Sequence, residues 1–346
     1  MRGSSIDIET SSMKDQSNLK TDTIANTFKR EIDLTLRMML YPLGFPVEIA
    51  TNSPKILESA KQSWGHHKSK FSLPPLKFAL AVEDNGVSES PPAPIVRARD
   101  GLLFIVADQR NLVICNLLEG SAYGWLDQAS LADEKYLRFY LIEAAVLSLI
   151  SASRATPVHA ACLSLNGRGF LLCGDSGAGK SSIAYAAART GWKYLSDDAT
   201  YVARDADRLL ALGNSHQMRF RPETRSLFSE LSTKKITPRS TGKPSVEVPT
   251  SDMPGISIVD EIKLDYVIFL KRGSSLAAQL LPIRPEVIRE YVASTFFPVL
   301  EVQRLQERNM EHILALQHFD LHYNTFEEAL DLLEKLATVR ASNSGN

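Results

Sequence analysis

The stretch GDSGAGKS at residues 174–181 has the residue types of a phosphate-binding loop: a glycine, four residues, then Gly-Lys and a hydroxyl residue. Its three glycines permit backbone angles that turn successive N–H groups toward one anion. Lys180 can reach the β and γ phosphates of a nucleotide, and the Ser181 hydroxyl can ligate a bridging magnesium ion. We therefore expect ATP as ligand and Mg²⁺ as cofactor. The predicted nucleotide contacts are Gly174, Asp175, Ser176, Gly177, Ala178, Gly179, Lys180, Ser181 and Ser182.

Two adjacent carboxylates, Asp197 and Asp198, follow the next apolar segment along the chain. If that segment is a strand, the pair lies at its carboxyl end, where ligands of open α/β sheets gather. One carboxylate could hold magnesium and the other could accept a proton from an attacking hydroxyl. A solvated turn is the alternative for such a pair, but the nearby phosphate loop favours chemistry.

The sequence on both sides of the loop predicts the strands and the helix that must position these groups. Apolar runs predict strands at 161–165 and 169–173, joined by a tight turn at Asn166-Gly167. A helix is expected over 181–189 and a further strand over 192–196. A hairpin that leads into the phosphate loop is unlike a purely parallel nucleotide-binding sheet, so we predict a mixed sheet.

The rest of the chain divides into two predicted domains with polar ends. We predict disordered tails at residues 1–26 and 341–346. We predict a small α+β domain over residues 27–150 and an α/β catalytic domain over residues 151–340. The small domain is expected to contain strands at 102–106 and 112–117 and a helix over 134–150. The segment 28–40 fits helix or strand. Near the carboxyl end, Thr325 and Glu328 form a predicted capping box.

Composition excludes several classes of protein. The 346 residues carry a net charge of -1, which argues against a nucleic-acid-binding protein. The apolar run 139–150 is short and contains Glu143, so we expect a buried helix and no membrane span. The amino terminus lacks an apolar signal segment, and the three cysteines show no metal-ligand spacing, so we expect a cytoplasmic protein with packed, reduced thiols.

Taken together, His159-Ala160-Ala161, GDSGAGKSS at 174–182 and Leu195-Ser196-Asp197-Asp198 resemble the HPr kinase/phosphorylase family. The resemblance covers about 40 residues and includes the spacing from the histidine to the loop lysine and on to the aspartate. It implies a catalytic fold similar to phosphoenolpyruvate carboxykinase, with catalytic roles for His159 and Lys180 and with Asp198 as the base. Asp197 and Ser181 are our candidate magnesium ligands. Because members of that family form hexamers, the resemblance also implies that this protein could form homo-oligomers.

Beyond Asp198 the sequence departs from that family. GNSHQMRFRPETRSLF at 213–228 stands where its Gly-rich signature and magnesium-binding glutamate are expected, which argues against HPr itself as substrate and against phosphorylase activity. Glu223 falls near that glutamate and is a magnesium candidate, the alternative being an acid at a helix start. Arg219 and Arg221 could contact phosphate or face water. The basic segment 232–254, which contains Lys234, Lys235, Arg239 and Lys243, is expected to be a mobile loop. It could bring a cation to the phosphates or could simply be a solvated loop.

These features favour a magnesium-dependent kinase that transfers the γ-phosphoryl group of ATP to a hydroxyl acceptor. A serine of a protein or peptide is the first acceptor class, and a small-molecule hydroxyl is the second. A nucleotide-dependent switch or binding module without phosphoryl transfer is the alternative from another class. The paired aspartates favour the kinase, because a pure binder needs no proton acceptor.

Overall fold

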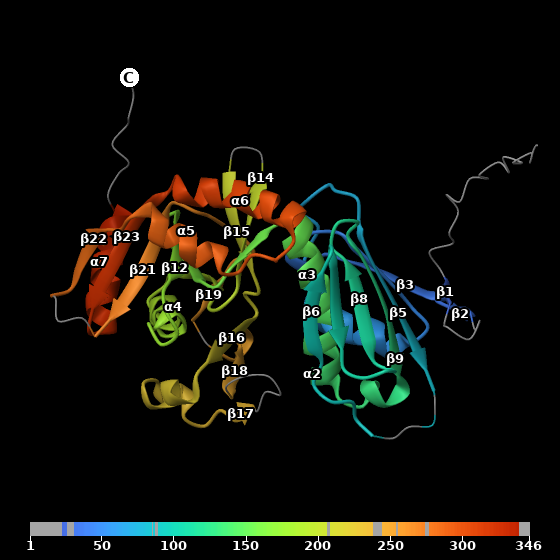
Figure 1. Cartoon of the computed structure of the whole chain (residues 1–346). Coiled ribbons are helices and arrows are strands. Elements are labelled where there is room, and N and C mark those ends of the chain that lie inside the picture. Colours follow the sequence, from blue (N-terminus) through green and yellow to red (C-terminus); the bar gives the residue numbers. More distant parts are fainter. Residues whose placement is uncertain are drawn as a thin grey trace, which may run out of the picture.

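A computed structural model describes residues 23–25, 31–84, 86, 89–205, 208–237, 244–253, 255–273 and 277–338. It is a mixed α/β structure in which two bodies lie side by side, with helix α6 (Leu300–Leu314) reaching from one toward the other (Figure 1). The predicted tail at 341–346 lies outside the described residues, as do Arg239 and Lys243 of the expected loop. Within the predicted tail at 1–26, Thr23–Ala25 forms a strand, β1, which pairs with β2 (Glu31–Asp33).

The first body is built on a seven-stranded sheet with the strand order β3-β4-β5-β9-β8-β7-β6. Its strands are β3 (Leu36–Leu40), β4 (Val47–Thr51), β5 (Leu76–Glu83), β6 (Ile95–Arg99), β7 (Leu102–Val106), β8 (Leu112–Asn116) and β9 (Ser121–Asp127). The β4-β5 and β5-β9 pairs are parallel and the others are antiparallel. The ambiguous segment 28–40 is therefore strand in its described part, and the strands predicted near 102 and 112 are confirmed.

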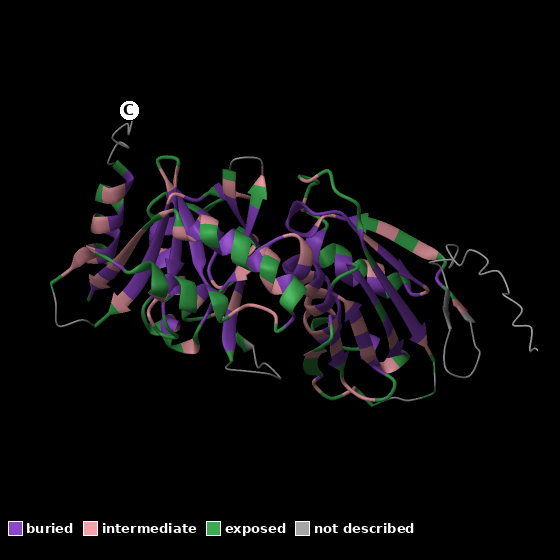
Figure 2. Ribbon diagram, turned by 45° about the horizontal axis from the view of Figure 1, so that its top comes forward, coloured by how far each residue is buried: buried purple, intermediate pink, exposed green. Residues whose placement is uncertain are grey.

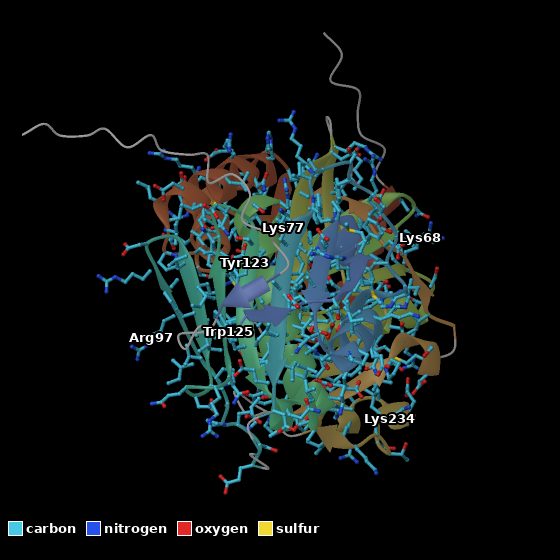
Figure 3. The ribbon with its side chains drawn as sticks, turned by 90° about the vertical axis from the view of Figure 1, so that its right-hand side faces the viewer. Lys68, Lys77, Arg97, Tyr123, Trp125 and Lys234 are labelled. Carbon is cyan, nitrogen blue, oxygen red and sulfur yellow. The ribbon has the colours of Figure 1, made fainter. Side chains whose placement is uncertain are left out.

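Helices cover one face of this sheet. They are α1 (Pro54–Trp64) and a continuous helix made of α2 (Glu134–Tyr136), a π-helical segment η3 (Leu137–Glu143) and α3 (Ala144–Ser153). The opposite face carries Lys77, Tyr123 and Trp125 (Figure 3) and is more exposed. Short 3-10 turns lie at η1 (Pro42–Gly44) and η2 (Gln128–Leu131).

The long helix runs through the predicted domain boundary at residue 150. Its 20 residues, Glu134–Ser153, are long and apolar enough to cross a membrane by length and composition, and half of its most apolar window is buried inside the protein. Leu141, Leu149 and Ile150 on this helix share a core with Val299 and Val302 of the second body. The helix therefore joins the two bodies through a shared apolar core, and Figure 2 shows buried residues in purple.

The second body is organised around another seven-stranded sheet with the order β19-β13-β11-β12-β21-β23-β22. Its strands are β11 (Ala161–Leu165), β12 (Arg168–Cys173), β13 (Lys193–Ser196), β19 (Ser257–Ile258), β21 (Tyr266–Arg272), β22 (Gln279–Pro282) and β23 (Gln317–Tyr323). β11 and β12 form the predicted hairpin, with positive φ at both Asn166 and Gly167, and β12 pairs in parallel with β21. The predicted mixed sheet is thus confirmed.

Helices pack on both faces of this sheet, because its central strands are apolar on both sides. Phe170 and Leu172 of β12 pack in the core that contains α4 (Lys180–Arg189) and α7 (Phe326–Thr338). Leu171 and Cys173 point into a different core with α5 (Pro285–Ala293) and α6. All three cysteines are buried and free, as expected. The Glu328 backbone N–H donates to the Thr325 side chain, and the Glu328 carboxylate accepts from the Thr325 N–H, which confirms the capping box.

Two smaller sheets complete the second body. One has the order β10-β14-β15-β20, from β10 (Thr156–Val158), β14 (Thr200–Asp205), β15 (Arg208–Gly213) and β20 (Ile262–Lys263). The other has the order β16-β18-β17, from β16 (Gln217–Phe220), β17 (Ile236–Thr237) and β18 (Ser245–Pro249), with turns η4 (Pro222–Ser226), η5 (Ser229–Leu231) and η6 (Thr250–Asp252) nearby. The expectation of a mobile loop at 232–254 is therefore wrong for its described part, because β18 is the middle strand of this sheet.

Candidate active site

The predicted phosphate loop joins the end of β12 to the start of α4, in the strand-loop-helix context that phosphate binding requires. Gly174, Gly177 and Gly179 have φ angles of 142°, 98° and 96°, which L residues rarely adopt. Lys180 is the first residue of α4. The positive end of the helix dipole and the free N–H groups of its first turn therefore point toward the loop.

Gly179 is also constrained by its neighbours. The Tyr323 hydroxyl, at the end of β23, donates a hydrogen bond to the Ala178 carbonyl. A Cβ atom at residue 179 would collide with that same hydroxyl. The loop is thus held from below by the sheet, and only glycine fits at this point.

Lys180 is largely buried, with 7% of its surface exposed. Its Nζ donates to the Gly174 carbonyl at 2.7 Å, so the ammonium lies inside the turn of the loop. Burial lowers its pKa, and the carboxylate of Asp198 acts in the opposite direction. A cation held in this way is positioned to meet phosphate oxygens.

An open cleft of about 560 Å³ lies over the loop and brings most of the predicted residues together. Its walls include Lys180, Ser181, His159, Asp198 and Glu223. Asp175, Ser176, Gly177, Gly179 and Ser182 also line it. Glu223 lies in the first turn of η4, so it is both an acid at a helix start and a wall of the cleft.

His159 and Asp198 form a polar pair, with His159 Nδ1 lying 3.1 Å from Asp198 Oδ1. The hydrogen bond from His159 is the main reason why the pKa of Asp198 lies below its usual value. Both side chains are about half exposed, so a substrate can reach them. An ionised carboxylate that faces the cleft can accept a proton.

The backbone around this pair is tied down by hydroxyl groups. Thr200 Oγ1 donates to the Ala160 carbonyl at 2.8 Å. The Tyr291 hydroxyl contacts the carbonyls of His159 at 2.5 Å and Gly174 at 3.0 Å. Tyr291 therefore links the histidine segment to the phosphate loop, a contact that no local sequence signal announces.

Asp197, a predicted magnesium ligand, is bound by donor groups of the protein itself. Its Oδ1 accepts from the Tyr194 hydroxyl at 3.1 Å and its Oδ2 from the Arg219 N–H at 2.8 Å. Burial raises its pKa to about 7. Only 6% of the residue is exposed, and it does not line the nucleotide cleft. Because both oxygens already bind protein donors, Asp197 fits a structural link between β13 and β16 better than a metal ligand.

Three arginines line the cleft beside the loop. The Arg221 guanidinium contacts the Ser176 hydroxyl. Arg219 pairs with Glu247 at 3.4 Å, and Arg272 lies over the Phe326 ring. For Arg219 and Arg221 the sequence predicts either a phosphate contact or exposure to water. No local sequence pattern points to Arg272. Because Arg219 is held in its ion pair with Glu247, Arg221 and Arg272 are the arginines of this cleft that lie where a polyphosphate would need positive charge.

The donor set fits magnesium held together with a nucleotide. Within the described ranges, no group of three or more His, Cys, Asp or Glu side chains is arranged to hold a metal ion. Mg²⁺ in nucleotide sites uses one or two protein oxygens plus phosphates and water, so such a group is not required. The Ser181 hydroxyl, which donates to the Asp197 carbonyl at 3.3 Å, and the Glu223 carboxylate are among the oxygens that line the cleft, together with the carboxylates of Asp175 and Asp198.

No protein-family model matches the chain, and no curated protein matches it. Among solved structures, the HPr(Ser) kinase/phosphatase from Coxiella burnetii is similar over 52% of this chain and 90% of its own, with 12% identity and a TM-score of 0.31. At that score we draw neither fold nor activity from the similarity. The assignment of a function therefore depends on this chain's own geometry.

Proposed function

We propose that the protein is an ATP- and magnesium-dependent kinase that transfers the γ-phosphoryl group to a hydroxyl acceptor. The observation that carries this proposal is the presence of Asp198, paired with His159, in the same cleft as Lys180 and Ser181. A phosphate loop alone serves many nucleotide-binding proteins. An accessible, ionised carboxylate beside it supplies the proton acceptor that transfer to a hydroxyl needs.

The residues divide the work of phosphoryl transfer. The loop N–H groups and the start of α4 bind phosphate oxygens, and Lys180 and Arg221 neutralise their charge. Asp198 accepts the proton of the attacking hydroxyl, and His159 orients its carboxylate. Magnesium, when bound, would be held by Ser181 and Glu223 and would draw charge from the phosphates. Asp197 is a positioning residue that fixes the end of β13 against β16.

The first acceptor class is a serine of a protein or peptide, and a small-molecule hydroxyl is the second. The test is mass spectrometry of a dephosphorylated host lysate given Mg-ATP and the protein, its Asp198→Asn variant or its Lys180→Ala variant. New phosphopeptides or phosphorylated metabolites that need both residues support the kinase. If nucleotide binds but the unaltered protein adds no phosphate to any component, a nucleotide switch replaces this proposal.

A further inference from the structure

A second cavity, of about 110 Å³, lies between the two bodies and shares Asp198 with the nucleotide cleft. The first body contributes Leu43, Trp64, His67, Glu143 and Leu147 to its walls. A base for phosphoryl transfer must contact the acceptor hydroxyl while the donor phosphate lies on its other side. A carboxylate that faces both a nucleotide cleft and a separate cavity meets that requirement.

The size of the cavity limits what it can hold. A water molecule takes up about 30 Å³ in the liquid, so a cavity of about 110 Å³ has room for only a few water-sized groups. That is the size of a small metabolite. A folded protein surface does not fit into a space of this size between two bodies.

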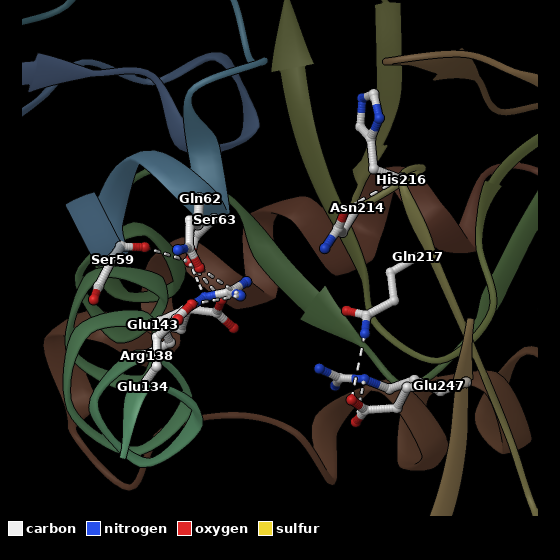
Figure 4. Close-up of polar contacts among 11 residues, drawn as sticks. Ser59, Gln62, Ser63, Glu134, Arg138, Glu143, Asn214, His216, Gln217 and Glu247 are labelled. Atoms are coloured by element: carbon white, nitrogen blue, oxygen red, sulfur yellow. Dashed lines mark hydrogen bonds and ion pairs between the residues drawn. The ribbon is translucent and has the colours of Figure 1, made fainter. Parts of the chain in front are cut away.

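Glu143 gives the cavity a negative wall. Its Oε1 accepts from the Ser63 hydroxyl at 2.7 Å and lies 3.4 Å from an Arg138 nitrogen (Figure 4). Within the part of the chain that the structure describes, no group bonds its other oxygen, Oε2. Together with Asp198, this oxygen makes the cavity attractive to a cation.

His67 gives the cavity a neutral hydrogen-bond donor. Its Nδ1 accepts from the Leu43 N–H at 3.0 Å. Burial lowers the pKa of His67 to about 4, so the ring is neutral and its hydrogen resides on Nε2. The ring of Trp64 adds an aromatic surface, which suits a cationic ligand.

Arg219, by contrast, is already engaged. It pairs with Glu247 and lies 5.3 Å from the centre of the Phe139 ring. Gln217 Nε2 contacts the same Glu247 at 3.4 Å (Figure 4). Both charged side chains are thus paired inside the protein, Arg219 with Glu247 and Glu143, through Oε1, with Arg138, and Glu143 Oε2 is the oxygen that stays available to a ligand.

The backbone that carries Glu143 is unusual. Glu143 is the last residue of the π-helical segment η3, and Phe139 belongs to the same segment. Single π turns inside α-helices are rare and occur frequently at functional sites, because they redirect side chains. Here the π turn brings one side chain to Arg219 and another to the cavity.

We propose that this cavity is the acceptor site and that the acceptor is a small hydroxylated amine, such as an amino alcohol or a free hydroxy amino acid. The inference rests on the proposed kinase function and selects its small-molecule class. The acceptor oxygen forms a bond to the γ-phosphorus, and the bond from that phosphorus to the β–γ bridging oxygen breaks. ADP leaves with the electron pair, and the hydroxyl proton passes to Asp198.

The test gives the full-length protein Mg-ATP with one of four probes: ethanolamine, L-serine, glycerate or glycerol. Phosphomonoester formation is followed by ³¹P NMR, and binding of each probe is followed by calorimetry. Ethanolamine and L-serine are expected to bind and to be phosphorylated, whereas glycerate and glycerol, which lack the ammonium group, are not. If glycerate or glycerol serves as well as the amines, or if no probe binds, the inference is wrong.

Glu143→Gln is the decisive variant, with Glu134→Gln as its matched control. Both carboxylates lie on the same long helix near Arg138, but only Glu143 lines the cavity. Loss of a charged contact is expected to lower kcat/KM for the amines by about 10- to 100-fold in Glu143→Gln and to leave Glu134→Gln unchanged. Equal effects of the two variants would overturn the inference.

Measuring Mg-ADP binding distinguishes failure of the acceptor site from failure of the proposed kinase function. A variant that binds Mg-ADP normally but has lost the amines has lost the acceptor site alone. If the unaltered protein does not bind Mg-ADP, the kinase proposal fails, and binding of the probes still decides whether the cavity recognises amines. If instead a peptide serine is phosphorylated equally well by the Glu143→Gln variant, the kinase stands and the small-molecule acceptor is rejected.

Discussion

His159 Nδ1 lies 3.1 Å from Asp198 Oδ1, although the two residues come from different loops. β10 leads into the first loop, and the second follows β13. In the proposed mechanism, the imidazole of this pair orients a carboxylate that lines the nucleotide cleft. Its predicted effects on proton transfer can be measured.

Replacing Asp198 by Asn removes the proposed base and should leave the nucleotide site in place. We expect the transfer rate to fall by about 10²- to 10⁴-fold, with the affinity for Mg-ADP changed little. Single-turnover kinetics and calorimetry measure the two quantities separately. A variant that retained the full rate would exclude Asp198 as the proton acceptor.

Replacing His159 by Ala removes the hydrogen bond that holds the pKa of Asp198 low. The carboxylate then becomes harder to ionise, so the acid limb of the kcat/KM profile should move to higher pH. His312→Ala, on α6 beside Arg204, is the control and should leave the limb in place. An unshifted limb in His159→Ala would contradict the proposed role of the histidine.

Asp197 is expected to make stability depend on pH. Its pKa is raised from 3.8 to about 7, so the folded protein binds this proton more tightly than the unfolded chain. The resulting stabilisation is fully present below pH 4 and is lost as the pH rises through 7. Asp197→Asn should therefore gain stability relative to the parent protein between pH 4 and pH 8, by as much as about 4 kcal/mol. Denaturant unfolding across this range measures the difference, and parallel curves would refute the prediction.

Arg221 should contribute to nucleotide affinity through its place beside Ser176. Arg221→Ala is expected to weaken Mg-ATP binding by about tenfold or more, the usual cost of a lost charge-assisted contact. Arg225→Ala is the matched control, because Arg225 lies in the same turn but binds the Ser232 carbonyl. Calorimetric titration compares them, and equal affinities in both variants would remove Arg221 from the site.

Gly179→Ala should abolish nucleotide binding and destabilise the protein. Gly191→Ala is its control, since Gly191 has nearly the same φ, 97°, but no neighbour within 4 Å of an added methyl group. Both variants carry backbone strain of about 1 kcal/mol, and only Gly179→Ala adds the collision with Tyr323. Thermal unfolding should therefore separate them by several degrees. Equal losses would mean that backbone strain alone limits residue 179.

Much of the second body could be predicted because its signals are local. The Asn166-Gly167 turn, the apolar run of β12 and the capping box at Thr325 each lie within a few residues, and each appears where the sequence placed it. The glycine-rich loop carries its own conformational requirement. Such features depend on the backbone preferences of a few neighbouring residues, which can be recognised in the sequence.

The remaining features of the site depend on contacts across the fold. Asp197 and Asp198 are adjacent and chemically alike, yet one is bound by Tyr194 and Arg219 and the other faces the cleft. The order of strands and turns in the sequence does not predict which of the two carboxylates accepts hydrogen bonds from protein donors. Likewise, the sequence predicts a loop where β18 forms, because the segment is rich in Ser, Thr and Pro and the partner of this strand, β16, lies about 30 residues earlier.

The hydroxyl of Tyr323 that supports the phosphate loop has a consequence for how the protein is made. Tyr323 follows its hydrogen-bond partner Ala178 by 145 residues, and its strand is the parallel neighbour of β21. During vectorial synthesis, the loop emerges from the ribosome long before this strand does. The nascent chain therefore passes through a stage in which the loop exists without its support, and nucleotide affinity should arise only once β23 has been translated and has joined the sheet.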